Sequence, residues 1–319
     1  MASVSDYPGL QDQSVLVTGG HGFIGRHVMT ALSRAGARPV SLAHPSSKVP
    51  PDLPGDSLPI DLEDEDGVAE VVKAFDILVH LAARTGGIQF QQESDEEVFT
   101  SNRRITDNLL SACVASGVRR IFLASSLVTY RPASEPLTES HPQLGPADRP
   151  GQYAWSKITD EVVAPWHGSL DFVVGRFGNV YGPGASFEPN RSTVVHALID
   201  RASRLGDGEE LVVWGEGDAI RSFVYADDAA EGILLAITRG TSGEAYNIDS
   251  GAAVSIAELA SVVRDQVNPS LVLRFDEEKP SGESYRVGSV DKLGALGYDP
   301  RVGLQEGIGR TVAWYRDSN

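Results

Sequence analysis

A glycine-rich segment directly follows the first apolar run of this chain. Residues 14–18 read Ser-Val-Leu-Val-Thr, which predicts a β-strand, and residues 18–25 then read Thr-Gly-Gly-His-Gly-Phe-Ile-Gly. From residue 24 to residue 36 the apolar spacing is helical. Glycines at positions 19, 22 and 25 allow a tight turn, a close approach of backbone N–H groups to a diphosphate, and close packing of the helix on the strand. The pattern predicts a strand-turn-helix unit that binds the diphosphate of a dinucleotide.

Apolar strands and amphipathic helices alternate through the first half of the chain. Strands are predicted at residues 39–43, 75–82 and 119–125, and helices at residues 68–74 and 102–117. Near-continuous apolar strands separated by helices of this length are typical of a parallel sheet that is covered on both faces. We therefore predict an α/β fold, a Rossmann-type doubly wound parallel sheet, with its ligands bound at the carboxyl ends of the strands.

The second half of the chain differs from the first in composition and in the length of its predicted elements. After about residue 180 it is richer in glycine, proline and acidic residues, and its elements are shorter. A strand is predicted at 172–176 and another at 210–214, with helices at 194–205, 225–239 and 255–267, the last opened by Ser255 as its N-cap. We predict a dinucleotide-binding domain at residues 1–180 and a smaller C-terminal α/β substrate lobe at residues 181–319, with some interleaving of segments.

Composition limits the partners of the chain. Lysine and arginine total 27 against 44 aspartate and glutamate residues, which gives a net charge of -17. An average surface of this sign repels nucleic acid and acidic membranes, so phosphorylated ligands must be held by a local pocket. Residues 1–13 lack a signal-peptide pattern, no apolar stretch is long enough to span a membrane, and Cys113 is the one cysteine. We expect a soluble, cytoplasmic protein with no disulfide framework and no metal site, and Cys113 as a buried apolar residue.

The end of the predicted 39–43 strand bears on the choice of cofactor. Residues 40–48 contain no acid that could accept a ribose 2′-hydroxyl, and a missing carboxylate removes the repulsion of a 2′-phosphate. The segment favours NADP(H) over NAD(H), with candidate phosphate donors His44, Ser46, Ser47 and Lys48. Arg26 either faces the same phosphate or is solvated on the helix surface. Asp61, next to Leu62, either accepts the adenine amino group or caps a turn.

Three polar residue types point to proton transfer at a carbonyl oxygen. Ser125 and Ser126 close the predicted 119–125 strand, at the edge where a ligand would lie. Tyr153 and Lys157 are four residues apart and share one face of a helix. A cation beside a tyrosine stabilises the phenolate and lowers the pKa of the hydroxyl toward neutrality, as exchange of a proton with a carbonyl oxygen requires. The combination predicts a Ser/Tyr/Lys oxidoreductase centre.

These motifs resemble, in order and over nearly the whole chain, the extended short-chain dehydrogenase/reductase (NAD-dependent epimerase/dehydratase) family of nucleotide-sugar enzymes. The segments that carry the resemblance are 18–25, 80–83, Asn102, Ser125 with Ser126, Tyr153 with Lys157, 176–183 and 221–228. Residues 80–88, 212–215 followed by Arg221, 279–282 and the 304–315 tail look most like the GDP-L-fucose synthase-like subgroup, whose members are NADPH-dependent epimerases and 4-ketoreductases. Family members usually form dimers through two helices, here 95–117 and 153–166.

The resemblance implies roles for individual residues. Ser126, or Ser125 because the spacing to Tyr130 leaves one residue of ambiguity, would donate a hydrogen bond to the sugar O4. Tyr153 would donate the proton, and Lys157 would orient the nicotinamide ribose. The predicted cofactor-binding residues are Gly19, Gly22, Phe23, Ile24, Gly25, Arg26, His44, Asp61, Leu62, Leu81, Ala82, Ala83, Tyr153, Lys157, Phe177, Asn179 and Val180. The predicted substrate-binding residues are Arg84, Leu127, Asn179, Thr193, Arg201, Trp214, Arg221 and Arg286.

Two departures from the subgroup narrow the expected reaction. Its cysteine and histidine, which exchange the C3 and C5 protons, are replaced here by Leu127 (or Val128) and by Thr193. Neither replacement exchanges a carbon-bound proton near neutral pH, although His196 lies one helical turn further on and is an alternative. The Asp-Glu pair that 4,6-dehydratases need is also missing after Ser126.

We expect NADPH-dependent reduction of the C4 keto group of an NDP-4-keto-6-deoxyhexose, dTDP- or GDP-linked, without C3/C5 epimerisation, in deoxysugar biosynthesis. The alternatives are an NAD-dependent nucleotide-sugar 4-epimerase, a full GDP-fucose-synthase-type epimerase/reductase, and a non-catalytic NAD(P)-sensing binding protein.

Overall fold

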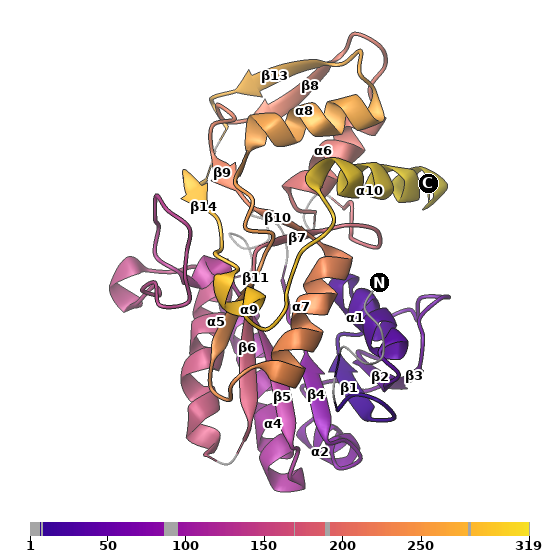
Figure 1. Cartoon of the computed structure of the whole chain (residues 1–319), viewed down its shortest axis with the longest axis vertical. Coiled ribbons are helices and arrows are strands. Elements are labelled where there is room, and N and C mark those ends of the chain that lie inside the picture. Colours follow the sequence, from indigo (N-terminus) through magenta and orange to yellow (C-terminus); the bar gives the residue numbers. More distant parts are fainter. Residues whose placement is uncertain are drawn as a thin grey trace.

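The computed structural model describes residues 7, 9–85, 95–168, 170–188, 192–279 and 282–318. Its largest element is a seven-stranded sheet in the order β11-β6-β5-β4-β1-β2-β3, with every neighbouring pair parallel (Figure 1). The strands are β1 (Ser14–Thr18), β2 (Arg38–Ala43), β3 (Asp56–Pro59), β4 (Ile77–His80), β5 (Arg120–Ser126), β6 (Phe172–Phe177) and β11 (Ala245–Ile248). The predicted doubly wound parallel sheet is confirmed.

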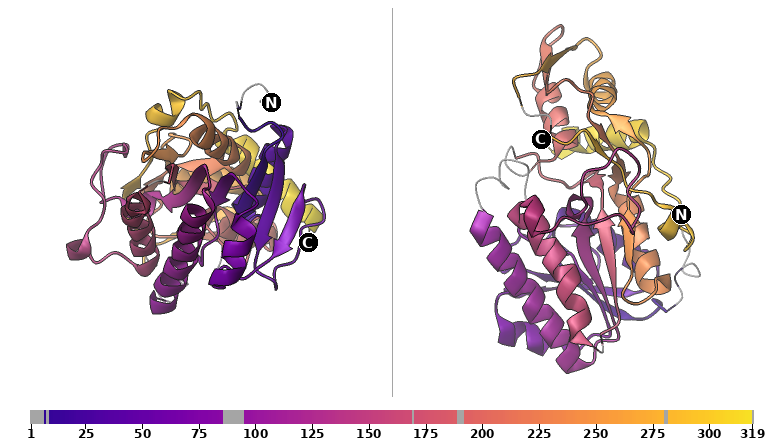
Figure 2. Two further views of the ribbon diagram at one scale, coloured as in Figure 1. Left: turned by 90° about the horizontal axis from the view of Figure 1, so that it is seen from below. Right: turned by 90° about the vertical axis from the view of Figure 1, so that its left-hand side faces the viewer.

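Helices cover both faces of this sheet (Figure 2). One face carries α1 (Phe23–Arg34) and α7 (Ala226–Arg239), which pack against each other and share a buried apolar cluster with β1, β4 and β6. The other face carries α2 (Glu65–Val72), α4 (Asp95–Ser116) and α5 (Gln152–Val163), followed by the 3-10 turn η4 (Ala164–His167). Cys113 lies in that second cluster, fully buried as predicted.

A smaller lobe lies beyond the carboxyl ends of the sheet strands (Figure 1). Its core is shared by α6 (Val194–Ser203), α8 (Ile256–Val267) and α10 (Leu304–Ser318). Three short sheets complete it: β8 (Glu210–Trp214) with β13 (Val272–Asp276); β9 (Ile220–Arg221) between β12 (Val254–Ser255) and β14 (Tyr285–Arg286); and β7 (Asn179–Tyr181) with β10 (Phe223–Tyr225). After β10 the chain returns to the large sheet as α7 and β11, and then α9 (Asp291–Gly294) precedes α10. A division at residue 180 stays a prediction, and the two parts exchange segments.

The sequence pattern located most elements but not their ends. Strand β8 has the predicted limits, and Ser255 caps α8 by accepting a hydrogen bond from the Glu258 N–H at 3.0 Å. Helix α4 begins seven residues before the predicted start, at Asp95, and strand β3 was not predicted because Asp-Ser-Leu-Pro carries no apolar run. In the described residues, none of the helices combines the length and apolar character that crossing a membrane requires.

Candidate active site

The glycine turn between β1 and α1 has the geometry of a diphosphate cradle. Gly19 has a positive φ of 72°, and a Cβ placed there would lie 3.1 Å from the backbone of Ala82. A Cβ on Gly25 would lie 2.1 Å from the Gly19 carbonyl oxygen, so these positions admit glycine alone. Gly22, the N-cap of α1, has no side-chain cap, and the first turn contains no acid. The free N–H groups and the helix dipole therefore fit the diphosphate of a dinucleotide.

Other predicted cofactor residues surround this turn. Phe23 and Ile24 form the start of α1. Leu81, Ala82 and Ala83 follow β4, and the Leu81 and Ala82 N–H groups each donate to Thr18 Oγ1 at 3.2 Å. Further along the sheet, Phe177 is buried at the end of β6 and Val180 is buried in the middle of β7, and Asn179 Nδ2 donates to the Ser222 carbonyl at 2.8 Å.

His44 and Asp61, the two residues expected near the adenosine, lie close to each other in the structure. Both His44 and Asp61 are exposed, and His44 Nε2 lies 3.8 Å from Asp61 Oδ2. Asp61 Oδ1 accepts a hydrogen bond from the Glu63 N–H at 3.0 Å, so this carboxylate does cap a turn, while the neighbouring Leu62 is buried. His44 Nδ1 bonds Ser46 Oγ at 2.7 Å. The segment after β2 thus presents polar groups to solvent.

Arg26 has a different environment from that segment. The arginine lies against Gly184, where a Cβ would approach its Cδ to 2.7 Å, and it lines a hollow of about 500 Å³ with the 50–54 loop and Trp314. Its Nε is buried without a hydrogen-bond partner among the described residues, and desolvation lowers the pKa of the guanidinium. Arg26 is therefore not simply solvated on the helix surface.

The serine pair at the end of β5 is divided by the fold. Ser125 is buried, and its hydroxyl donates to Glu161, a mostly buried carboxylate that also pairs with Arg176 at 2.5 Å. Ser126 is part-exposed, caps the 3-10 turn η2 (Leu127–Thr129) through the Val128 N–H at 3.3 Å, and lies 3.4 Å from the Phe177 carbonyl. Of the two hydroxyls, that of Ser126 is the one accessible to a ligand.

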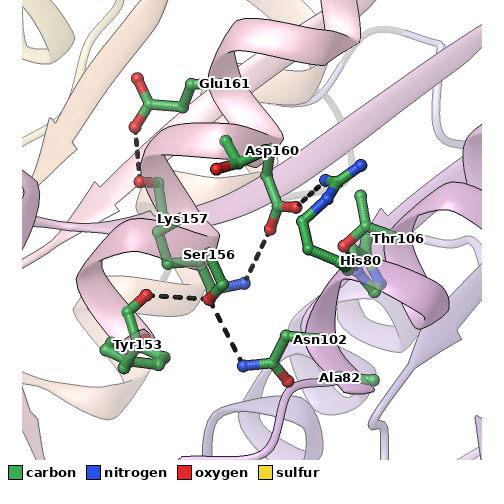
Figure 3. A network of polar contacts seen from close by, with 12 residues as sticks. His80, Ala82, Asn102, Thr106, Tyr153, Ser156, Lys157, Asp160 and Glu161 are labelled. Carbon is green, nitrogen blue, oxygen red and sulfur yellow. Dashed lines mark hydrogen bonds and ion pairs between the residues drawn. The ribbon is translucent and has the colours of Figure 1, made fainter. Parts of the chain in front are cut away.

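Tyr153 and Lys157 lie on successive turns of α5, as the spacing predicted (Figure 3). Helix α5 packs against β5 and η2, which brings this pair to the strand end that carries Ser126. The Tyr153 side chain is part-exposed, and its hydroxyl bonds none of the described residues. Lys157 is buried, and its ammonium is directed at Asp160 Oδ2, 3.4 Å away.

A network of buried polar side chains lies beneath this helix, and the sequence did not predict it. His80 bonds Thr18 Oγ1 through Nδ1 at 2.7 Å and Thr106 Oγ1 through Nε2 at 3.3 Å. Burial, assisted by the charge of Lys157, lowers the pKa of His80 to about 3, so the imidazole is neutral near pH 7. Asn102, which the motif pattern singled out, bonds both main-chain groups of Arg84 and thereby fixes the loop after β4.

The small lobe brings together several of the predicted substrate residues. Arg221 on β9 and Arg286 on β14 are paired in register, and Glu283 accepts from both of them. Trp214, at the end of β8, is half exposed with the Lys279 ammonium 5.9 Å from its ring. Arg201 on α6 donates to the Val212 carbonyl at 2.7 Å, which ties it to the same strand as Trp214. The small lobe thus carries an arginine pair on β9 and β14 and, separately, Arg201 beside the strand that ends in Trp214.

The positions expected to hold the second acid and base carry other chemistry. Leu127 is buried with Tyr130 and Leu137, so it presents no side chain to a ligand, whereas Val128 is part-exposed. Thr193 Oγ1 bonds His196 Nδ1 at 2.9 Å.

His196 and Arg84 are also engaged elsewhere. His196 is buried between the rings of Phe23 and Phe187, its Nε2 faces the Gly182 carbonyl at 3.3 Å, and burial lowers its pKa to about 4. This buried imidazole does not replace the missing acid or base. The exposed Arg84 side chain pairs with Glu97 of α4. Residues 86–88 and 280–281, which the motif comparison included, lie outside the described residues.

A Rossmann-type sheet, a glycine turn and a Tyr-x-x-x-Lys helix at the carboxyl edge of the sheet together define a short-chain dehydrogenase/reductase. The model of the NAD dependent epimerase/dehydratase family matches residues 15–249, and the chain belongs to this family. The resemblance drawn from the motifs is confirmed.

The relatives of this chain carry different enzyme names. The chain is 36% identical over 243 residues to a putative GDP-L-fucose synthase 2 of Oryza sativa subsp. japonica, covering 73% of this chain and 70% of that protein. It is 30% identical over 323 residues to a dTDP-4-dehydro-6-deoxy-D-allose reductase of Streptomyces sp, covering 95% and 96%. Among solved structures, the UDP-glucose 4-epimerase of Thermus thermophilus in complex with NAD matches with a TM-score of 0.80 at 28% identity, over 96% of this chain and 100% of that one. The protein is thus an enzyme of the nucleotide-sugar epimerase, dehydratase and reductase family, with an NAD(P)-binding fold.

Proposed function

We propose that the protein is an NADPH-dependent 4-ketoreductase of an NDP-4-keto-6-deoxyhexose, dTDP- or GDP-linked, which leaves C3 and C5 unchanged. One observation carries the proposal: helix α5, which bears Tyr153 and Lys157, packs against β5 and the η2 turn that Ser126 caps, while Leu127 (or Val128) and Thr193 stand where the resemblance expects a second acid and base. The Streptomyces relative that aligns over nearly the whole chain bears a reductase name, which supports the same reading.

The roles of the residues follow from their chemistry. NADPH, when bound, would supply the hydride that reduces the C4 carbonyl. The Tyr153 hydroxyl donates the proton that completes the alcohol at O4, and Ser126 donates a hydrogen bond to the same oxygen as negative charge develops there. Lys157 orients the nicotinamide ribose. The diphosphate is bound by Arg221 and Arg286, since paired guanidinium groups donate in a fork to phosphate oxygens.

Further features support parts of this proposal. The segment after β2 is exposed and contains no carboxylate from His44 to Lys48, and His44, Ser46 and Lys48 would donate to a 2′-phosphate. On the outer surfaces of α4, α5 and η4, Val114, Val162 and Trp166 are exposed apolar side chains. We infer a homodimer through these helices, which sedimentation of the wild-type protein tests directly.

The decisive experiment offers the purified protein dTDP- and GDP-4-keto-6-deoxyhexoses with NADPH. Oxidation of NADPH with formation of the 4-hydroxy sugar is expected, and no oxidation with any of these substrates would exclude the reductase. Repeating the reaction in D₂O tests the second half of the proposal, because deuterium at C3 or C5 of the product would reveal an epimerase. Tyr153→Phe is expected to lower kcat by at least about 10²-fold while NADPH binding and the circular dichroism spectrum stay unchanged.

An NAD-dependent nucleotide-sugar 4-epimerase is the second candidate, because a 4-epimerase solved with NAD shares the fold over nearly the full chain. Such an enzyme regenerates its cofactor in each turnover and retains it through purification. Release of the cofactor by denaturation, followed by mass spectrometry, separates the two. Stoichiometric NAD⁺ indicates the epimerase, and protein that purifies without dinucleotide indicates the reductase.

A further inference from the structure

One buried carboxylate lies between two cations beneath the candidate active site. Asp160, on α5, is 4% exposed, and its Oδ2 lies 3.4 Å from Lys157 Nζ. Its Oδ1 accepts a hydrogen bond from Arg103 Nη1 of α4 at 2.6 Å. Lys157 itself is only 3% exposed, so its charge is separated from bulk water.

Titratable and charged groups from three elements, β4, α4 and α5, surround Lys157. From β4, His80 faces it as a neutral imidazole. From α4, Arg103 reaches it through Asp160, and the outer nitrogen of Arg103 pairs with Asp107 at the surface. On α5 itself, Tyr153 lies one turn before Lys157, and Glu161 is turned away toward Ser125 and Arg176.

Burial alone would make the charged form of Lys157 unfavourable. Desolvation favours the neutral amine, and an opposite charge within about 4–6 Å reverses that effect. Among the described residues, Asp160 is the carboxylate that bonds this ammonium. Desolvation raises the pKa of Asp160, while Lys157 and Arg103 oppose the rise, so Arg103 helps to keep the carboxylate ionised.

We propose that Asp160, clamped by Arg103, is a positioning residue that keeps Lys157 charged and fixes its ammonium for the nicotinamide ribose. The inference rests on the proposed role of Lys157 in cofactor binding and goes beyond it, because Asp160 and Arg103 act through Lys157. Through Thr106 and His80, the same polar network continues to Thr18 at the glycine turn. The two halves of the cofactor site are therefore connected by buried side chains.

The test measures the dissociation constant of NADPH at one fixed pH by nicotinamide fluorescence, with NADH in parallel. In Asp160→Asn, which keeps the shape of the side chain and removes its charge, the dissociation constant is expected to rise about tenfold for both cofactors, because the Lys157 ammonium has lost its charged hydrogen-bond partner. Arg103→Met is expected to weaken binding in the same direction, because Asp160 is no longer held in place. Arg103→Lys, which restores a cation beside Asp160, is expected to return the dissociation constant to within a few-fold of the wild-type value. Asp107→Asn, which removes the exposed partner of Arg103, is the control and leaves the dissociation constant unchanged.

Rescue by the conservative variant separates positioning from damage to the structure. An Asp160→Asn dissociation constant equal to that of the control would overturn the inference, as would equal weakening of binding in Arg103→Met and Arg103→Lys. If Asp160→Asn does not fold, the comparison of Arg103→Met with Arg103→Lys decides alone. No sugar is present in this titration. Wild-type protein that binds NADPH but reduces no 4-keto sugar would therefore remove the proposed reaction and leave this test intact.

Discussion

Ser125 and Ser126 are consecutive residues of β5, yet their hydroxyl groups serve different purposes. The Ser125 hydroxyl is buried and donates to Glu161, within a network that includes the Glu161–Arg176 ion pair. The Ser126 hydroxyl is part-exposed at the strand end and caps the η2 turn. In a strand, consecutive side chains point to opposite faces, and this alternation places one serine in the core and the other at the ligand-binding edge.

Alanine substitutions at these two positions are expected to separate activity from stability. Ser126→Ala lowers kcat by about 10²-fold, as expected for one lost donor to a developing oxyanion, with the free energy of unfolding nearly unchanged. Ser125→Ala keeps kcat within a few-fold but lowers the free energy of unfolding by about 1–3 kcal/mol, because a buried carboxylate loses a donor. Steady-state kinetics and urea unfolding of both variants provide the check. Equal effects of the two substitutions on kcat would refute the assignment.

The preference for NADPH is expected to respond to one added carboxylate after β2. His44→Asp places a negative charge where the 2′-phosphate would lie. The phosphate carries about 1.5–2 unit charges, and each costs about 1 kcal/mol at 4 Å in water, so kcat/KM for NADPH is expected to fall about 10- to 30-fold. The value for NADH changes little, since NADH has no such phosphate. Val49→Asp adds the same charge to another exposed position of the same loop and is the control. If the ratio of kcat/KM for NADPH to kcat/KM for NADH stays constant in His44→Asp, the 2′-phosphate does not bind beside His44.

Trp214 is expected to bind the nucleoside base or sugar without taking part in the reaction. Trp214→Ala raises the KM of the nucleotide sugar about 3- to 10-fold and leaves kcat nearly unchanged, since a stacking contact of about 0.5–1.5 kcal/mol is made equally in the ground and transition states. The matched control is Val272→Ala, because Val272 lies on the paired strand β13 and is exposed to a similar extent, 53% against 50%. A lower kcat at unchanged KM would show that Trp214 does not act as a binding plate.

The fold and the outline of the site could be predicted because they depend on local patterns. The glycine turn follows its strand directly, and four-residue spacing is enough to place Tyr153 and Lys157 on one helix face. The choice between Ser125 and Ser126 could not be made, because it depends on Glu161, which lies 36 residues from Ser125 in sequence and is brought close by packing of α5 on β5.

Long-range partners explain the other omissions. Arg103 and Asp160 are 57 residues apart, and nothing in either local sequence indicates that α4 and α5 join them. His196 matched a catalytic residue type at a plausible helical spacing, but its apolar surroundings come from Phe23 and Phe187 on other segments. Residue type and periodicity locate helices and strands, while burial decides which polar side chains stay available for chemistry.

His80 is expected to make stability depend on pH in the mildly acidic range. The pKa of His80 is lowered from 6.5 to about 3 in the folded protein, so between these values the unfolded chain binds the extra proton. The contribution of His80 to the free energy of unfolding is therefore fully present above pH 6.5 and decreases as the pH falls toward 3. From pH 7 to pH 5 the contribution of His80 amounts to about 2 kcal/mol, because one pH unit corresponds to about 1.4 kcal/mol and 1.5 units lie below 6.5.

Urea unfolding of the wild type at both pH values measures the total change, and in His80→Asn that change is expected to be smaller by this amount. A His80→Asn protein with the wild-type pH dependence would contradict the prediction.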